Sequence, residues 1–444
     1  MLTNSDGPNV RISREAKVGV QYSWSRTASA WRLVLAVVFL TQGTASVLLA
    51  QGPQDYIVRF REGTTAAARA VVVRNAGAAL GFNFNRVNAA AVRVPNANAL
   101  AALQNNPSVL AIIPDRPVVA FQNGKGKPGS GGGSPQVIPA GVVRVGMPTV
   151  TSDGRGIGVA VLDTGVDLAH PDLAGAVDAF NAFGGPSCQD DQGHGTHVSG
   201  IIAAHDNGAD VIGVAPNATI YCVKVLDSAG SGSDATVMAG LDWVLDHHNS
   251  SDPNIKVVNM SLGRPGAVGD NPDLHHLIAD LELAGITVVV AAGNDPSMEV
   301  SQQIPAGYSE VIAVASTTAQ AGSNQCRFLA SPIAADTASY FTTDDATVSA
   351  PGEDKEDVNR GCFISSVGIL STRLGGGTTR MSGTSMASPH VAGIVARYYQ
   401  AGFTAIDIRQ FLQSDADRVG IAPLNSPTSS YTFDGYREGI AQAP

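Results

Sequence analysis

From residue 136 onward, short apolar runs alternate with stretches in which apolar residues recur at helical spacing. Five runs have the length of strands, and most are almost continuously apolar: 158–162, 220–225, 256–260, 287–291 and 311–315. Such runs are typical of parallel strands that are covered on both faces. Helical spacing lies between them, at 195–204, 234–247 and 273–284. The alternation predicts an α/β domain over 136–444, with a parallel β-sheet and helices on both faces.

The chain before residue 136 follows a different order. Strand and helix patterns alternate as β-α-β-α-β, at 55–60, 64–80, 89–94, 97–104 and 109–119. This order predicts a small α+β domain over 51–121. Residues 122–135 contain a run of Gly, Ser and Lys that cannot form a core, so they are expected to be a flexible linker. Flexible chain is where proteolysis concentrates, and we expect a processing cut between Phe121 and Pro135.

The first 50 residues resemble a targeting signal. Two arginines precede an apolar run at 33–40, and a second apolar patch ends at Ala50. The polar interruption at 41–44 leaves the run short of the ~20 residues that a membrane-spanning helix needs. We therefore expect a secretory signal peptide over 1–50, cleaved near Ala50, rather than a stable membrane anchor. Residues 1–23 are unusually polar for such a signal, and a misassigned start codon is one explanation.

The charge composition argues against one class of binding partner, nucleic acids. Charged residues make up 15% of the 444 residues, against a typical ~25%, and the formal net charge is −10. The chain has no block of lysine and arginine, which argues against nucleic acid as a partner. The 49 glycines suit a buried sheet whose strands are joined by tight turns.

The four cysteines of an exported chain permit two disulfides in three pairings. A Cys326–Cys362 bond is favoured because it would staple an irregular region. Cys222 lies in an apolar run and could equally be a buried free thiol. There is no CxxC motif, so a zinc site made of cysteines is not expected.

Three separated motifs carry candidate chemistry. Ser385 precedes the apolar run of a helix at 391–399, Asp163 follows the strand at 158–162, and His194 lies where another helix should begin. A serine before an apolar run is most often an ordinary helix cap. However, a nucleophilic serine needs a base to take its proton, and that base needs an acceptor to orient it. Asp163 and His194 can fill those two roles.

These motifs, DTG at 163–165, HGTH at 194–197 and GTSMASPH at 383–390, resemble those of the subtilisin-like serine proteases, or subtilases. Their order of Asp, His and Ser is also that of subtilisin. The resemblance covers 136–415. It implies a secreted serine endopeptidase that hydrolyses peptide bonds through an acyl-enzyme, with protein or peptide substrates.

The resemblance also implies a role for each site residue. Ser385 would be the nucleophile, His194 the general base and Asp163 its orienting partner. Asn294, which follows an Ala-Ala-Gly run, would stabilise the oxyanion together with the backbone N–H of Ser385. Residues that pair with the substrate or line its main pocket would be Gly230, Ser231, Gly232, Ser261, Leu262, Gly263, Ala291, Ala292 and Gly293, with the segment near Gln303. Plain turns are the alternative for the glycine-rich segments.

A structural calcium ion (Ca2+) is a further implication of the resemblance. Its ligands would be Gln136, Asp172 and Asn207, with carbonyl oxygens of His205, Ala209 and Val211. A solvated loop is the alternative. A zinc site at His194 and His197 is not expected, because the chain has no HExxH motif.

The α+β domain at 51–121 resembles the inhibitory propeptide of subtilase precursors. We therefore expect a self-processing precursor, inhibited by its own propeptide and monomeric. Residues 327–359 depart from the family pattern, and no role is assigned to them. An α/β-hydrolase esterase is disfavoured because its triad runs Ser, acid, His. A catalytically silent binding protein is disfavoured because all the triad residues are present.

Overall fold

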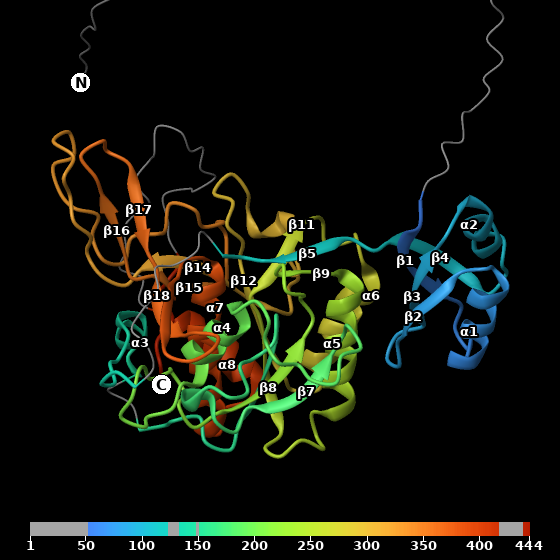
Figure 1. Ribbon diagram of the computed structural model, residues 1–444, viewed down its shortest axis with the longest axis horizontal. Coiled ribbons are helices and arrows are strands. Elements are labelled where there is room, and N and C mark those ends of the chain that lie inside the picture. The colour runs from blue at the N-terminus through green and yellow to red at the C-terminus, as the bar shows by residue number, and fades with distance from the viewer. Residues whose placement is uncertain (1–51, 123–132, 148–150, 417–437) are drawn as a thin grey trace, which may run out of the picture. The chain divides into compact units, whose positions relative to one another are not determined.

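The computed structural model describes residues 52–122, 133–147, 151–416 and 438–444. Their main feature is a seven-stranded sheet in the order β15-β14-β12-β10-β6-β8-β7 (Figure 1). All its neighbouring strands are parallel. The strands are β6 (Gly158–Asp163), β7 (Val177–Asn181), β8 (Thr219–Lys224), β10 (Ile255–Met260), β12 (Thr287–Ala291), β14 (Ile312–Thr318) and β15 (Val348–Glu353). The predicted α/β fold is confirmed, with β7 and β15 added at the two edges.

Helices cover both faces of this sheet. One face carries α4 (His194–Ala203), α7 (Thr384–Gln400) and α8 (Ala405–Ser414), and the other carries α5 (Asp234–His247) and α6 (Pro272–Leu283) (Figure 1). Neighbouring residues of β6 point to opposite faces: Val161 lies in the first core and Leu162 in the second. This double burial explains why the strands are apolar without a period of two. The described residues of this part also form the short helix α3 (Ala140–Arg144) and the 3-10 turns η2 (Pro171–Leu173) and η3 (Val300–Gln302).

The residues before the linker form a second, smaller sheet in the order β2-β3-β1-β4, with its own core. Its elements are β1 (Gln54–Phe60), α1 (Ala66–Asn75), β2 (Ala79–Asn83), β3 (Ala89–Val94), α2 (Ala97–Gln104) and β4 (Val109–Pro114). We call residues 54–114 the N-terminal subdomain. The expected helix at 64–80 is too long, because Gly77 adopts a φ of 77° and donates to the Arg74 carbonyl at 3.0 Å. That left-handed turn ends α1 and starts β2.

A third sheet joins the strand after this subdomain to the α/β part. Its order is β13-β11-β5-β9, where β5 is Pro117–Ala120, β9 is Ser231–Ser233, β11 is Leu262–Pro265 and β13 is Gln303–Ile304. Strand β5 runs antiparallel to both β9 and β11. Most of the expected linker, and the whole of the expected signal at 1–50, lie outside the described residues. No described helix has both the length and the hydropathy needed to cross a membrane.

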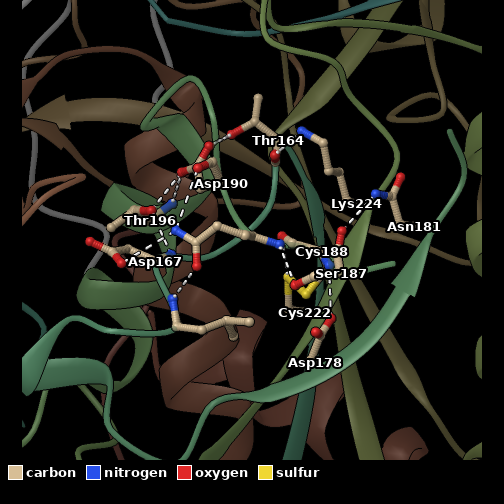
Figure 2. The surroundings of a disulfide bond; sticks show 12 residues. Thr164, Asp167, Asp178, Asn181, Ser187, Cys188, Asp190, Thr196, Cys222 and Lys224 are labelled. Atoms are coloured by element: carbon tan, nitrogen blue, oxygen red, sulfur yellow. Dashed lines mark hydrogen bonds between the residues drawn. A yellow bond between two sulfur atoms is a disulfide. The ribbon is translucent and has the colours of Figure 1, made fainter. Parts of the chain in front are cut away.

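Two disulfides are present in the described residues. Cys326–Cys362 is formed as predicted, and it links the loop after β14 to the hairpin of β16 (Lys355–Val358) and β17 (Ile364–Val367). A second hairpin, β18 (Ile369–Thr372) and β19 (Thr378–Met381), leads into α7. The free-thiol alternative for Cys222 is wrong, because Cys222 on β8 is bonded to Cys188 (Figure 2).

Two histidines are wholly buried between α4, α7 and the loops that cover them. His390 is 0% exposed, its Nδ1 lies 2.8 Å from the Met386 carbonyl, and its Nε2 has no hydrogen-bond partner among the described residues. Burial lowers the pKa of His390 to about 4 and that of His197 to about 3. Both rings are therefore neutral in the folded protein near neutral pH.

These depressed pKa values predict a loss of stability in acid. Between the unfolded pKa of ~6.5 and a folded pKa of about 4, the unfolded chain binds a proton at His390 that the folded chain does not. Stability should therefore fall as pH decreases through this window, by about 3 kcal/mol for His390. Urea unfolding of a Ser385→Ala background at several pH values measures the slope.

His390→Gln should flatten that slope, while the control His276→Gln, at an exposed side chain, should leave it unchanged. Equal slopes in the two variants would contradict the assignment.

Candidate active site

The carboxyl end of β6 brings Asp163 against the first residue of α4. Asp163 Oδ1 lies 2.7 Å from His194 Nδ1, and both side chains are 0% exposed. The Thr164 N–H also donates to Asp163 Oδ1, at 2.7 Å. The carboxylate therefore holds the proton of His194 on Nδ1 and leaves Nε2 as the basic nitrogen. Nε2 has no hydrogen-bond partner among the described residues.

Ser385 lies in the first turn of α7. Its Oγ donates to the Ser261 carbonyl at 2.8 Å, and Ser261 Oγ donates to the Ser385 carbonyl at 3.0 Å. The second bond has a clear cause: Pro389, four residues on, has no N–H to give to that carbonyl. Ser261 thus replaces the missing helical bond. The Ser385 hydroxyl is directed at Ser261 in this structure and is not bonded to His194.

The carbonyl oxygen of Phe121 lies next to Ser385. The Ser385 N–H, which has no acceptor inside the helix, donates to the Phe121 carbonyl at 3.3 Å. Asn294 Oδ1 accepts from the Thr384 N–H and hydroxyl, both at 2.9 Å, so Nδ2 is left facing outward. A Cβ on Gly383 would come within 2.3 Å of the Phe121 oxygen and 3.0 Å of Asn294 Nδ2. Only glycine leaves room for this carbonyl.

The chain that carries Phe121 is held as an added strand. The Ala120 N–H donates to the Gly230 carbonyl at 3.0 Å, and the Phe121 N–H to the Ser261 carbonyl at 3.2 Å. The structure therefore brings together the two segments expected to bind a substrate backbone, and places β5 between them. Val118 pairs with Gly232, Val119 with Ser231 and Gly263, and Ala120 with Leu262.

Among the residues expected to line a substrate pocket, Gly263 lies near Phe121. A Cβ on Gly263 would be 2.6 Å from Phe121 Cε2, so the ring lies directly on this glycine. Ala291 and Ala292, at the end of β12, are 0% exposed. Gly293 follows them, and a Cβ there would lie 3.2 Å from Gln303 Cδ.

Known proteins share both this sequence and this fold. The profile of the subtilase family (peptidase S8) matches residues 154–433. The chain belongs to the subtilase family. It is 31% identical to Subtilisin E of Bacillus subtilis (strain 168) over 416 residues, which span 89% of this chain and 94% of that one. It is 39% identical to the Thermostable alkaline protease of Halalkalibacterium halodurans over 276 residues, or 61% of this chain and 65% of that one.

A solved structure is also similar. It is described as "Crystal structure of a cold adapted subtilisin-like serine proteinase", and it matches with a TM-score of 0.51 and 29% identity over 67% of this chain and 92% of that one. The protein is therefore a subtilisin-like serine endopeptidase.

The subtilase has a supporting residue that the sequence reasoning missed. Asp190 Oδ1 accepts from the N–H of Gly193 and from Thr164 Oγ1, each at 2.9 Å. Its Oδ2 accepts from the Thr196 N–H at 3.0 Å and from the Thr196 hydroxyl (Figure 2). One buried carboxylate thus joins the end of β6 to the start of α4. An acidic residue shortly before a predicted helix is a capping signal that could have identified it.

The residues expected to hold calcium in the subtilase lie in one loop region. Asp172 is 0% exposed; its Oδ1 accepts from Asn207 Nδ2 at 3.0 Å and its Oδ2 from the Val211 N–H at 3.2 Å. Gln136 Nε2 donates to the carbonyls of His205 at 2.7 Å and Val211 at 3.2 Å. The Ala209 N–H donates to Asn207 Oδ1 at 2.9 Å. Across the described ranges, no group of three or more His, Cys, Asp or Glu side chains could hold a metal ion.

Asp190 should matter for turnover more than for substrate binding. Asp190→Asn places an amide N–H against donors, so we expect kcat to fall about 10- to 100-fold, the equivalent of about one bond to a charged group. KM should change by less than about threefold, because Asp190 does not contact β5. Steady-state kinetics on a peptide substrate measure both.

The matched control is Asp178→Asn, since Asp178 is exposed and accepts one bond, from the Cys188 N–H. A loss confined to KM, or an equal loss in both variants, would contradict this role.

Proposed function

We propose that this subtilase is a secreted endopeptidase made as a self-processing precursor, with Asp163, His194 and Ser385 as its triad. Ser385 Oγ attacks the substrate carbonyl while His194 Nε2 takes its proton, and the C–N bond then breaks as His194 returns that proton to the leaving amine. Asp163 holds the imidazole and stabilises its charged form. Water completes the cycle by hydrolysing the acyl-enzyme. The Ser385 hydroxyl must first leave the Ser261 carbonyl.

The observation that carries this proposal is the bond from the Ser385 N–H to the Phe121 carbonyl. In our proposal this carbonyl occupies the oxyanion site, with Asn294 Nδ2 as its second donor. Residues 51–121 are then the propeptide, and the bond between Phe121 and Gln122 is the one that the enzyme cuts in itself. This assignment lies within the predicted interval, 121–135, at its first bond.

Contacts of the N-terminal subdomain support an inhibitory role. The N–H groups of Asn85 and Arg86 donate to the Asp242 carboxylate on α5 at 2.8 and 2.9 Å. Arg59 forms an ion pair with Asp273 on α6 at 2.9 Å. Together with β5, these contacts would keep the product strand in the site after cleavage.

Two further features support export of the precursor. The apolar pattern of the first 50 residues favours a secretory signal, although it lies outside the described residues. Two disulfides favour an oxidising compartment. We therefore propose extracellular activity on protein or peptide substrates, by a monomer.

Processing provides the direct test. The purified wild-type precursor should release a fragment that ends at Phe121, seen by intact-mass spectrometry, while Ser385→Ala stays whole. Phe121→Asp should slow the cut by at least about tenfold, because a carboxylate would replace a ring that lies on Gly263. Phe121→Tyr should be cut normally.

The control for added charge is Leu110→Asp, at an exposed position on β4, and its self-cleavage should match that of the wild type. Normal self-cleavage of Ser385→Ala would remove Ser385 as nucleophile, whereas a first cut at another bond would remove only the assignment of Phe121–Gln122.

We also propose that the loop around Asp172 holds a structural calcium ion. The donor set fits: a buried carboxylate and the carbonyls of His205 and Val211 are hard oxygen ligands. The amides of Gln136 and Asn207 direct nitrogen at these oxygens. Rotation of each amide would present its oxygen instead, in exchange for the bonds that these oxygens accept from the N–H groups of Gly208 and Ala209. Ala209 would supply a further carbonyl. The role is stabilisation and takes no part in the reaction.

Calcium binding should raise the thermal stability of the protein. Adding Ca2+ at about 100 times its Kd should stabilise the Ser385→Ala protein by about 2.7 kcal/mol, and chelation should reverse this. Asp172→Asn should abolish the response, while Asp206→Asn in the same loop, at an exposed side chain, should keep it. A melting temperature unaffected by Ca2+ in the parent protein would refute the site.

A further inference from the structure

The region without an assigned role contains two buried glutamates. Glu353 ends β15 and Glu356 lies in β16, and both are 0% exposed. Glutamate is almost never fully buried unless it is paired. The nearby cations are engaged with other groups: Lys355 pairs with Asp357 at 3.4 Å, and Arg380 pairs with Asp354. Their burial therefore has to be compensated by the hydrogen bond between the two side chains and by the hydroxyls of Ser339 and Ser366.

Each carboxyl has one oxygen with a donor and one without. Ser366 Oγ donates to Glu353 Oε2, and the Tyr340 N–H donates to Glu356 Oε1 at 2.9 Å. Glu353 Oε1 and Glu356 Oε2 have no other donor among the described residues. A proton held between the two carboxyls would satisfy both, whereas two buried anions side by side would repel.

The electrostatics agree with this arrangement. Burial raises the pKa of Glu353 well above its usual range, and the charge of Glu356 and the hydrogen bond between the two side chains raise it further. Burial also raises the pKa of Glu356, while its hydrogen bond from Glu353 lowers it. These causes favour a neutral carboxylic acid at Glu353 that donates to Glu356.

The pair reaches the nucleophile by two short routes. Ser366 Oγ lies 2.6 Å from Ser382 Oγ, and Ser382 is three residues before Ser385. On the other route, Gly352, the neighbour of Glu353, accepts from the Gly383 N–H at 3.1 Å. A Cβ on Gly352 would come within 2.5 Å of the Gly383 oxygen, so the backbones at these two glycines are in direct contact.

We propose that Glu353 and Glu356 are positioning residues for the nucleophile, acting through Ser366 and Ser382 on the loop 382–385. This loop carries both the hydroxyl of Ser385 and the N–H that faces the Phe121 carbonyl. The inference rests on the proposed role of Ser385. Since a misplacement of about 1 Å can cost about 100-fold in rate, a firm hydrogen-bonded support behind this loop has a direct kinetic value.

The sharpest test breaks the relay with a small change. Ser366→Ala removes the hydroxyl between Glu353 and Ser382, whereas Ser365→Ala removes a neighbouring hydroxyl on an exposed position of β17. We expect kcat of the processed enzyme to fall about tenfold in Ser366→Ala, with KM within about twofold, and both constants to be unchanged in Ser365→Ala. Active-site titration with a fluorophosphonate normalises the enzyme concentration.

A second pair of variants tests the shared proton. Glu353→Gln keeps a neutral donor to Glu356 and should retain kcat within about threefold, while Glu353→Ala should lose at least about tenfold. Infrared difference spectra at neutral pH should show a protonated carboxylic acid in the wild-type enzyme that is absent from Glu353→Gln.

Each result has one meaning. Equal kcat in Ser366→Ala and Ser365→Ala, or a change in KM alone, overturns the positioning role, even where Ser385 is labelled normally. Equal losses in Glu353→Gln and Glu353→Ala, or the absence of the acid band from the wild-type enzyme, overturn the shared proton. Failure of the wild-type enzyme to be labelled at Ser385 refutes the proposed nucleophile instead.

Discussion

The buried hydrogen bond between Asp163 and His194 is the contact on which the site is built. It forms because the carboxyl ends of parallel strands lie on the same side of the sheet, and α4 begins on that side. The same edge receives Ser261 after β10 and Asn294 after β12. Asp190 then fixes how α4 meets β6, so that the imidazole has a single orientation. The chemistry therefore depends on the register of the sheet as much as on the identity of the residues.

The second feature of the site is that it binds the chain's own backbone. Strand β5 lies between β9 and β11 and pairs with both, so it joins them into one sheet. Backbone pairing of this kind is indifferent to side chains, so specificity has to come from side-chain contacts such as that between the Phe121 ring and Gly263. Close approach of the bound backbone explains why positions 263 and 383 are glycines: a Cβ at either position would clash with Phe121.

The insertion stapled by Cys326–Cys362 has a different character. It has a small core of its own around Cys326, Ile333 and Val358, and it contains the buried Glu353 and Glu356. Burial of two glutamates costs stability in most settings. Their position, joined through Ser366 to Ser382 in the loop before α7, is understandable if they hold that loop in place.

Much of this protein could be read from its residues, because local patterns have local causes. The apolar runs predicted the parallel sheet, and the three motifs predicted the family. Other features needed the folded chain. Gly77 ended a helix that the apolar pattern extended, the partner of Cys222 depended on how a loop returns to β8, and Asp190 and the pair of Glu353 and Glu356 acquired meaning only from distant neighbours. Sequence determined which groups are present; tertiary structure decided which of them meet, because burial and hydrogen bonding across the fold are not local properties.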